Sequence, residues 1–264
     1  MTTTAPTGPR VAVTTTDGVT TIALDSPHNR NALSNQLVTE LHAALAAAAA
    51  DDAVRSVVLT HTGNTFCAGA DLSEATSSSS LDPARERADQ LIDLLRAIVA
   101  LPKPVIGRID GNVRAGGMGL VGACDIVIAS DSSSFALTES RLGLAASVIS
   151  LTLLPRVHPR AAERYFLTGE KFDAATAVAM GLVSEAVGDT ASLDASVATI
   201  TGELGLCSPQ GLRESKAVVT HDVLAYLDAN RDRVAAQSSS LFASDDAREG
   251  MTAFLERRKP RWAL

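Results

Sequence analysis

Aromatic residues are scarce in this chain of 264 residues, which holds one Trp, two Tyr and six Phe, or 3%. Proteins that stack nucleic-acid bases or sugar rings use aromatic surfaces, so this shortage argues against both kinds of ligand. Basic residues are also outnumbered, with 23 Lys and Arg against 30 Asp and Glu, a net charge of −7. A net acidic chain disfavours a nucleic-acid partner, although a few local cations would suffice for one phosphate-bearing ligand.

Cysteine is the next shortage, and long apolar runs are absent. Cys67, Cys124 and Cys207 are odd in number and widely spaced, which argues against a disulfide framework and a zinc site. The five histidines form no pair at metal-ligand spacing, so we expect no metal. The alanine-rich run 43–50 is too short to span a membrane, and the start, 1–10, lacks the pattern of a secretory signal. We expect a cytoplasmic protein with a disordered segment 1–10.

What the sequence does contain is an apolar fraction of 46%, enough for a sizeable core. Two strand-like runs, 11–13 and 19–24, flank Asp17-Gly18, which is typical of a hairpin turn. Strands at 57–60, 105–109 and 125–129 alternate with helical patterns at 34–50 and 88–100. This alternation predicts an α/β core with function on the loops. Beyond about residue 150 the pattern predicts only helices, over 151–155, 160–167, 174–180, 193–205, 209–229 and 245–257.

Two glycine-containing segments, 66–72 and 111–119, each follow a predicted buried strand. Small residues there would let a ligand approach the backbone, and amides at a helix start point outward. Two amides that converge from separate loops would form an oxyanion hole for a carbonyl oxygen that gains negative charge. The alternative is that these glycines only mark turns.

Several segments, taken in order, resemble the signature segments of the crotonase, or enoyl-CoA hydratase/isomerase, superfamily. The resemblance implies an α/β fold built as a spiral of ββα units over 11–200, with a helical trimerisation region over 201–264. It also implies a homotrimer, or a hexamer formed by two trimers, and an acyl-CoA thioester as substrate. The segments are 29–34, 66–72, 101–106, 111–125, 135–143, 167–169 and 181–183.

By position, the resemblance assigns the backbone amides of Ala70 and Gly116 to the thioester oxygen. Donors aimed at an enolate-like oxygen stabilise the transition state more than the ground state. Coenzyme A would be part of the substrate rather than a separate cofactor. The long cationic side chains of Arg30, Arg258 and Lys259 suit its phosphates, although these residues could also be ordinary surface charges. The residues assigned to coenzyme A are Arg30, Ala68, Asp71, Leu72 and Lys259, with Arg258 beside the last.

The acid–base residues match the family only in part. Hydratases of the family place two glutamates around the water; one of these positions is Glu139, and the other is occupied by Gly119. We predict an enoyl-CoA hydratase-like lyase with Glu139 as its single carboxylate. The alternatives are an enoyl-CoA isomerase that uses Glu139 as sole base and a non-catalytic acyl-CoA binder. Segments 118–120 and 141–150 resemble a bacterial methylglutaconyl-CoA hydratase-like subgroup, which also carries glycine there.

Two other interpretations are weaker. Residues 117–122 match the dinucleotide-binding pattern G-x-G-x-x-G, but they lie in mid-chain rather than at the end of an opening strand. Cys67 could be a thiol nucleophile, but no histidine lies in a recognisable partner motif, and a small buried cysteine is commoner.

Overall fold

The computed structural model describes residues 8–71, 73–74 and 82–264, and in this part the larger sheet has the order β1-β2-β3-β5-β7-β10. Within this sheet only β1 and β2 are antiparallel. They are joined through Asp17 and Gly18, whose positive φ angles suit a tight hairpin turn. The remaining pairs are parallel. These strands are β1 (Val11–Thr16), β2 (Val19–Leu24), β3 (Ser56–His61), β5 (Val105–Ile109), β7 (Ile126–Ser130) and β10 (Glu185–Val187).

A smaller sheet of order β4-β6-β8-β9 carries the loops of interest. Its first three strands are parallel, and each follows a strand of the larger sheet: β4 follows β3, β6 follows β5, and β8 follows β7. The chain therefore repeats a strand–strand unit, closed by α2 (Pro83–Val99) in one repeat and by α3 (Gly116–Ala123) in the next. The smaller sheet consists of β4 (Thr65–Cys67), β6 (Asn112–Arg114), β8 (Ser134–Ala136) and β9 (Phe172–Asp173).

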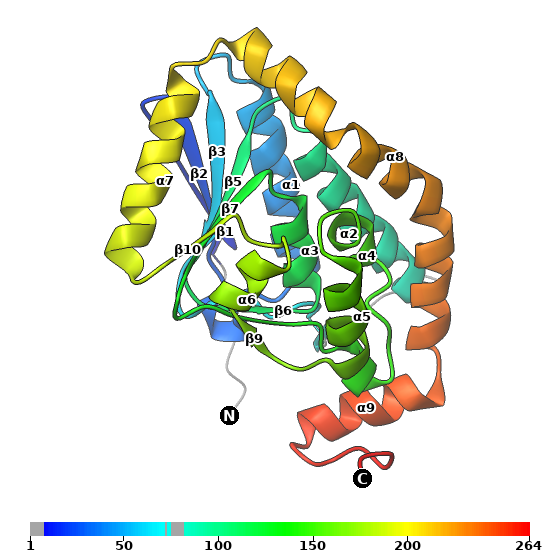
Figure 1. Ribbon diagram of the computed structural model, residues 1–264. Coiled ribbons are helices and arrows are strands. Elements are labelled where there is room, and N and C mark those ends of the chain that lie inside the picture. Colours follow the sequence, from blue (N-terminus) through cyan, green and yellow to red (C-terminus); the bar gives the residue numbers. More distant parts are fainter. Residues whose placement is uncertain (1–7, 72, 75–81) are drawn as a thin grey trace.

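Helices cover both faces of the larger sheet (Figure 1). On one face α7 (Thr190–Gly205) buries Leu193 and Val197 against β3, β5 and β7. On the other face α1 (Asn35–Ala50), α2 and α3 enclose the main core. The remaining helices are α4 (Ser150–Leu153), α5 (Pro159–Thr168), α6 (Ala174–Ala179), α8 (Pro209–Phe242) and α9 (Asp245–Leu255), with short 3-10 turns η1 (Pro27–Asn29) and η3 (Glu139–Leu142).

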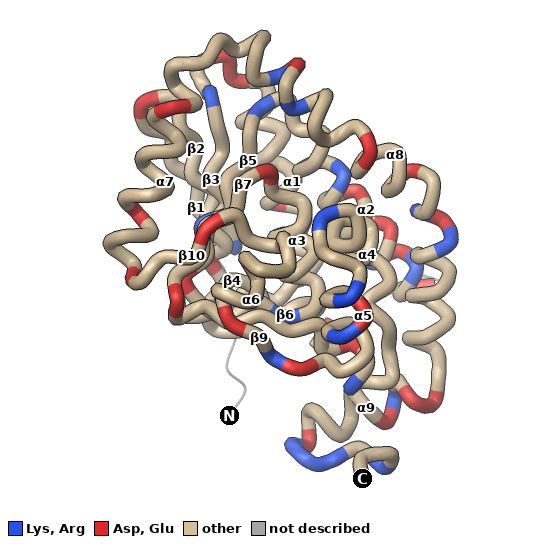
Figure 2. The backbone as a smooth tube through the Cα atoms, viewed as in Figure 1, with Lys and Arg blue, Asp and Glu red and all other residues tan. Residues whose placement is uncertain are grey.

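The long helix α8 is tied to the core by charge as well as by packing. Exposed ion pairs join it to α2, where acidic and basic residues follow both helices (Figure 2), as in Arg96–Asp228 at 2.8 Å. A buried pair lies deeper, with Lys216 Nζ 2.7 Å from Asp125 Oδ2. Lys216 also donates to the carbonyl oxygens of Ile98 and Lys103, both at 3.0 Å. Losing one partner of such a buried pair leaves an uncompensated charge, so this contact fixes α8 in place.

Most predicted elements are confirmed. The helix predicted over 34–50 begins where Ser34 accepts a hydrogen bond from the Leu37 amide, and the strand predicted over 105–109 is β5. The prediction of helices alone beyond residue 150 was wrong, because β9 and β10 lie there. Strands of two or three residues are too short to show a periodic pattern. The helix predicted over 209–229 continues to Phe242.

The start of the chain is partly outside the described residues, which begin at Gly8. The Arg10 amide donates to Glu40 of α1 at 2.5 Å, so the chain is held to the core just before β1. The division at residue 200 stays a prediction, and α7 runs through that position. No helix of the described residues is long and apolar enough to cross a membrane.

Candidate active site

Three parallel strands of the smaller sheet, β4, β6 and β8, end at the same edge. Two or three residues after these strands end, the chain reaches Ala70, Gly116 and Glu139. Ligands of parallel sheets bind at the carboxyl ends of the strands, where successive loops meet. The fold therefore brings the three residues predicted to be catalytic to one edge.

The first loop presents the amide of Ala70. Leu33 pairs with the residues on either side of it, donating to the Gly69 carbonyl at 2.8 Å and accepting from the Asp71 amide at 3.4 Å. In a parallel bridge of this kind the central residue turns its own N–H away from the partner strand. Ala70 is exposed, and no acceptor within the described residues takes its N–H.

The second loop presents the amide of Gly116, the first residue of α3, whose N–H has no intrahelical acceptor. Ala115, just before it, has φ +46° and ψ −120°, a conformation that favours glycine. The Ala115 amide is held by the Ala136 carbonyl of β8 at 3.1 Å. A Cβ built on Gly69 would lie 3.3 Å from the Gly116 nitrogen, so the two loops are in contact at the residue that precedes Ala70.

Close packing explains why small residues occupy the second segment. A Cβ on Gly117 would lie 2.7 Å from Cys67 Cβ, and one on Gly116 would lie 2.8 Å from Leu33 Cδ1. Residues 117–122 form the buried interior of α3 rather than a phosphate-binding loop, which argues against the dinucleotide interpretation. Burial also raises the pKa of the Cys67 thiol to about 12, and a thiol that stays protonated is a poor nucleophile.

The third strand end carries Glu139, the first residue of η3. Its Oε2 atom is buried and has no hydrogen-bond partner among the described residues. Burial raises the pKa of Glu139 to about 7, opposed only by the backbone amide of the same residue, and no charged side chain of the described residues contributes. A carboxyl group that titrates near neutrality is suited to both accept and return a proton.

A side chain at the position of Gly119 would meet buried apolar side chains. A Cβ built there would lie 2.7 Å from Ile149 Cγ2 and 3.3 Å from Leu95 Cδ1, and both of these side chains are buried. The Cβ of a glutamate there would therefore meet apolar atoms, and Ile149 would have to move to admit it. Of the described residues at these three strand ends, Glu139 is the one carboxylate with an unpaired buried oxygen.

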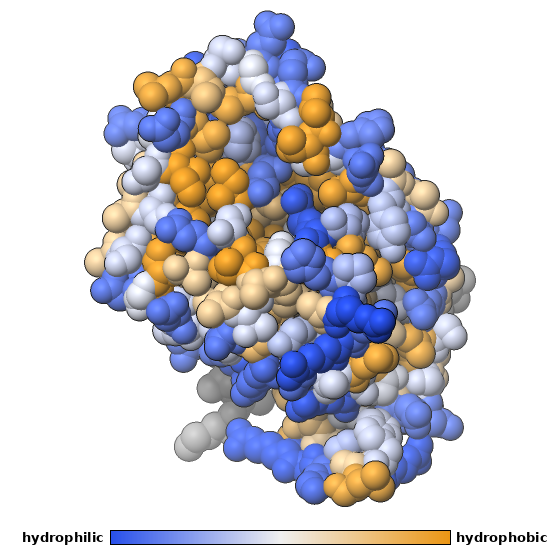
Figure 3. All heavy atoms as spheres, viewed as in Figure 1, coloured by the Kyte–Doolittle hydropathy of each residue, from blue (hydrophilic) through white to orange (hydrophobic). Residues whose placement is uncertain are grey.

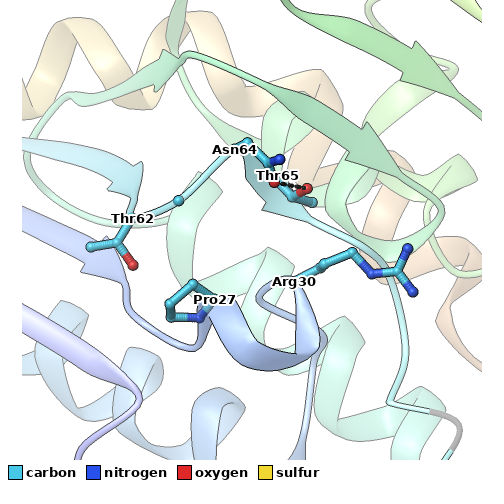
Figure 4. A pocket seen from close by; sticks show the side chains of 6 residues that line it. Pro27, Arg30, Thr62, Asn64 and Thr65 are labelled. Carbon is cyan, nitrogen blue, oxygen red and sulfur yellow. Dashed lines mark hydrogen bonds between the residues drawn. The ribbon is translucent and has the colours of Figure 1, made fainter.

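The residues assigned to coenzyme A have different surroundings in the structure. Arg30 is exposed, and its carbonyl accepts the Ala68 amide at 3.1 Å, which holds the two residues side by side. In Figure 4 the Arg30 guanidinium points away from Thr62, at the rim of a hollow of about 420 Å³. The hollow is lined by Pro27, Arg30, Thr62, Gly63, Asn64 and Thr65.

Asp71 accepts hydrogen bonds from η1 and from its own loop. Its Oδ2 accepts from Asn29 Nδ2 at 3.0 Å, and its Oδ1 accepts from the Ser73 amide and hydroxyl at 3.0 and 2.6 Å. Burial alone would raise the pKa of Asp71, but these hydrogen bonds outweigh it and lower the pKa. Leu72 lies outside the described residues.

The C-terminal cations follow α9. Arg258 lies 2.7 Å from Glu249 and 2.6 Å from Glu256, so its charge is compensated locally. Lys259 is exposed in the tail beyond. Within the described residues no group of three or more His, Cys, Asp or Glu side chains could hold a metal ion.

Sequence reasoning missed two contributors to this site. The left-handed backbone of Ala115 gave no signal, because alanine is not expected in that conformation. Ile149 lies thirty positions from Gly119, and only the packing of α4 against α3 brings them together.

The chain matches the family model described as enoyl-CoA hydratase/isomerase over residues 14–263. An enoyl-CoA hydratase of Mycobacterium avium, known from its crystal structure, is 52% identical with a TM-score of 0.89, covering 97% of this chain and 100% of that one. A carnitinyl-CoA hydratase of the same species is 29% identical with a TM-score of 0.85, covering 97% and 99%. The peroxisomal Δ3,5-Δ2,4-dienoyl-CoA isomerase of Arabidopsis thaliana is 31% identical over 254 residues, covering 92% and 91%.

A ββα spiral with two free amides and a carboxylate at neighbouring strand ends defines a crotonase-type protein. The chain belongs to the enoyl-CoA hydratase/isomerase family. This confirms the superfamily and the fold class predicted from the sequence, whereas the subgroup stays a prediction.

Proposed function

We propose that the protein binds an enoyl-CoA thioester, holds its carbonyl oxygen on the amides of Ala70 and Gly116, and transfers a proton with Glu139. One observation carries the proposal: a carboxyl group with a pKa of about 7 and an unpaired buried oxygen lies at the same sheet edge as two free amides. Loss of a proton next to a thioester puts negative charge on the carbonyl oxygen, which those amides would stabilise.

Migration of the double bond is the reaction that these groups complete by themselves. Glu139 removes a proton from C2 of a 3-enoyl thioester, and the electron pair passes into a dienolate whose oxygen accepts the two amide hydrogen bonds. The protonated carboxyl group then returns the proton at C4, which leaves a 2-enoyl thioester. A single base suffices, and the apolar surroundings of Gly119 supply no other.

Hydration of a 2-enoyl-CoA, the reaction predicted from the sequence, is the second candidate. It is favoured by the names of two relatives, both hydratases from Mycobacterium avium. In this reaction Glu139 alone would take the proton of the attacking water and deliver it to C2. The water would have to be held without a second carboxylate at Gly119.

An absorbance assay with defined thioesters separates the candidates. A 3-enoyl-CoA gains the conjugated enoyl absorbance if the double bond migrates, whereas crotonyl-CoA loses it if water adds. A panel of linear and branched thioesters extends the assay to chain length. If thioesters bind but neither absorbance changes at any pH between 6 and 9, catalysis by Glu139 is refuted and the acyl-CoA binder remains.

For the rest of the substrate we propose that Arg30, Ala68, Asp71, Leu72 and Lys259 hold coenzyme A, and that the protein assembles as a trimer or a pair of trimers. The exposed guanidinium of Arg30 supports the first part. Arg30→Gln should raise KM for the thioester with kcat nearly unchanged, because the phosphates lie far from the reacting carbons. Sedimentation at several concentrations tests the assembly.

A further inference from the structure

The turn that carries Glu139 lies against the last helix of the described chain. A Cβ built on Gly143 would lie 2.5 Å from the carbonyl carbon and oxygen of Asp246 in α9. One built on Gly250 would lie 2.8 Å from Leu142 Cα and would overlap the Leu142 carbonyl oxygen. At both points backbone meets backbone with no room for a side chain, and we call these two contacts the glycine seam.

The seam is one hydrogen bond away from Glu139. The Gly143 amide, at φ +72°, donates to the Glu139 carbonyl, and the Leu144 amide donates to the same oxygen at 3.0 Å. The other side of the turn is tied to α5, where Arg141 Nε donates to the Thr168 carbonyl at 2.9 Å. Because η3 is a single turn, a shift of Gly143 is transmitted directly to the backbone of Glu139.

One face of α9 consists of small residues, which allows this close contact. Its buried residues Ala247, Gly250 and Ala253 recur every three positions, and Ser244 caps the helix through the Ala247 amide at 3.1 Å. Charges on the two helices that pack against the turn are paired elsewhere rather than with Glu139. The pairs are Arg160–Glu163, Arg164–Glu170, Arg248–Asp245, Arg258–Glu249 and Arg261–Asp246.

We infer that α9 positions the carboxylate of Glu139 through the glycine seam, which makes Gly143 and Gly250 positioning residues for the proton transfer. The inference rests on the proposed function for its activity readout. It joins a residue near the middle of the chain to a helix about one hundred residues further on, and no side-chain interaction is needed to do so.

The test compares Gly250→Ala with Gly202→Ala in the full-length protein. Both replace a helical glycine, but nothing lies within 4 Å of the Cβ added at Gly202. Gly250→Ala should lower kcat about tenfold or more, with KM for the thioester changed less than about threefold, because a small displacement of a catalytic group is costly. The ascending limb of its pH–rate profile should also shift, by about half a pH unit or more. If Gly250→Ala folds and matches Gly202→Ala in kcat and in pH profile, the inference is wrong.

Two further measurements keep the test decisive. Ser244→Ala weakens α9 without adding an atom to the seam, so it replaces Gly250→Ala if that variant does not fold, and the same shifts are expected. The change in Tm caused by Glu139→Gln, followed from pH 4 to 8, reports the titration of Glu139 without any substrate. That pH dependence should change when Gly250→Ala or Ser244→Ala is present, and should not change with Gly202→Ala. If the unaltered protein acts on no thioester, the proposed function fails, while this Tm comparison still supports or overturns the inference.

Discussion

The three strand ends that form the site are held in two different ways. The loops of Ala70 and Gly116 offer only backbone amides, and their positions are set by backbone hydrogen bonds to Leu33 and Ala136 and by contact between the two loops. The turn of Glu139 offers a side chain, and its nearest restraints come from α5 and α9. The amides are thus fixed by hydrogen bonds within the α/β core, whereas the carboxylate also depends on packing from the end of the chain. This difference ranks the expected effects of substitutions.

The largest effect is expected where the side chain itself acts. Glu139→Gln keeps the shape of the carboxyl group but cannot take a proton, so kcat should fall by about 10²- to 10⁴-fold. Binding of a saturated acyl-CoA should stay nearly unchanged, since the amides of Ala70 and Gly116 remain. Steady-state kinetics and a calorimetric Kd measure the two quantities, and unchanged turnover would remove Glu139 from the mechanism.

A second large effect is expected at Gly119, which faces the buried side chains of Ile149 and Leu95. We call these two side chains the apolar wall. Gly119→Glu places a carboxylate among Ile149 and Leu95, where both overpacking and unpaired charge oppose folding. We expect the free energy of unfolding to fall by about 4 kcal/mol. Denaturant titration measures this, and adding Ile149→Ala should restore part of the loss. A stable Gly119→Glu protein with strong crotonyl-CoA hydration would instead show that the wall can open.

The amide loops should be sensitive to a single methyl group. Gly69→Ala places a Cβ 2.7 Å from Ala115 Cβ at a backbone φ of +94°, so the Ala70 amide would be displaced from the thioester oxygen. Loss of one oxyanion donor costs about 10²- to 10³-fold in kcat. Adding Ala115→Gly should recover part of the rate, because it removes the clashing methyl group. Gly188→Ala, at a glycine with no atom within 4 Å of its Cβ and no positive φ, is the control for adding a methyl group without contact or backbone strain.

The pH dependence of stability follows from the pKa of Glu139. Its value of about 7 in the folded state lies above the ordinary value of 4.5, so between these two pH values the folded protein binds more protons than the unfolded chain. The stabilisation is complete below about pH 4.5 and is lost as pH rises through 7, a change of about 3 kcal/mol. Glu139→Gln should therefore raise Tm at pH 8 but not at pH 4. Glu203→Gln, at an exposed position in α7, should change Tm equally at both.

The same difference decides what could be predicted from the sequence. The amide loops were predictable because close backbone packing demands small residues in a short segment, and 66–72 and 111–119 show them. Glu139 was assigned only by resemblance, since nothing in its local sequence reports the burial that raises its pKa. The seam of Gly143 with α9 could not be predicted, because pairing residues a hundred positions apart requires the folded packing.

The smallest effect should distinguish the two amide loops from each other. Glycine occupies the positive-φ position in the first loop, at Gly69, whereas alanine occupies it in the second, at Ala115. Backbone strain of that kind costs about 1–3 kcal/mol, and the extra freedom that glycine gives the unfolded chain offsets part of any relief. Ala115→Gly should therefore raise the free energy of unfolding by about 1 kcal/mol, measured by urea titration. Its kcat should change only a few-fold, because α3 still fixes the Gly116 amide. A loss of stability instead would mean that the Ala115 methyl group, packed beside Gly69, holds the two loops together.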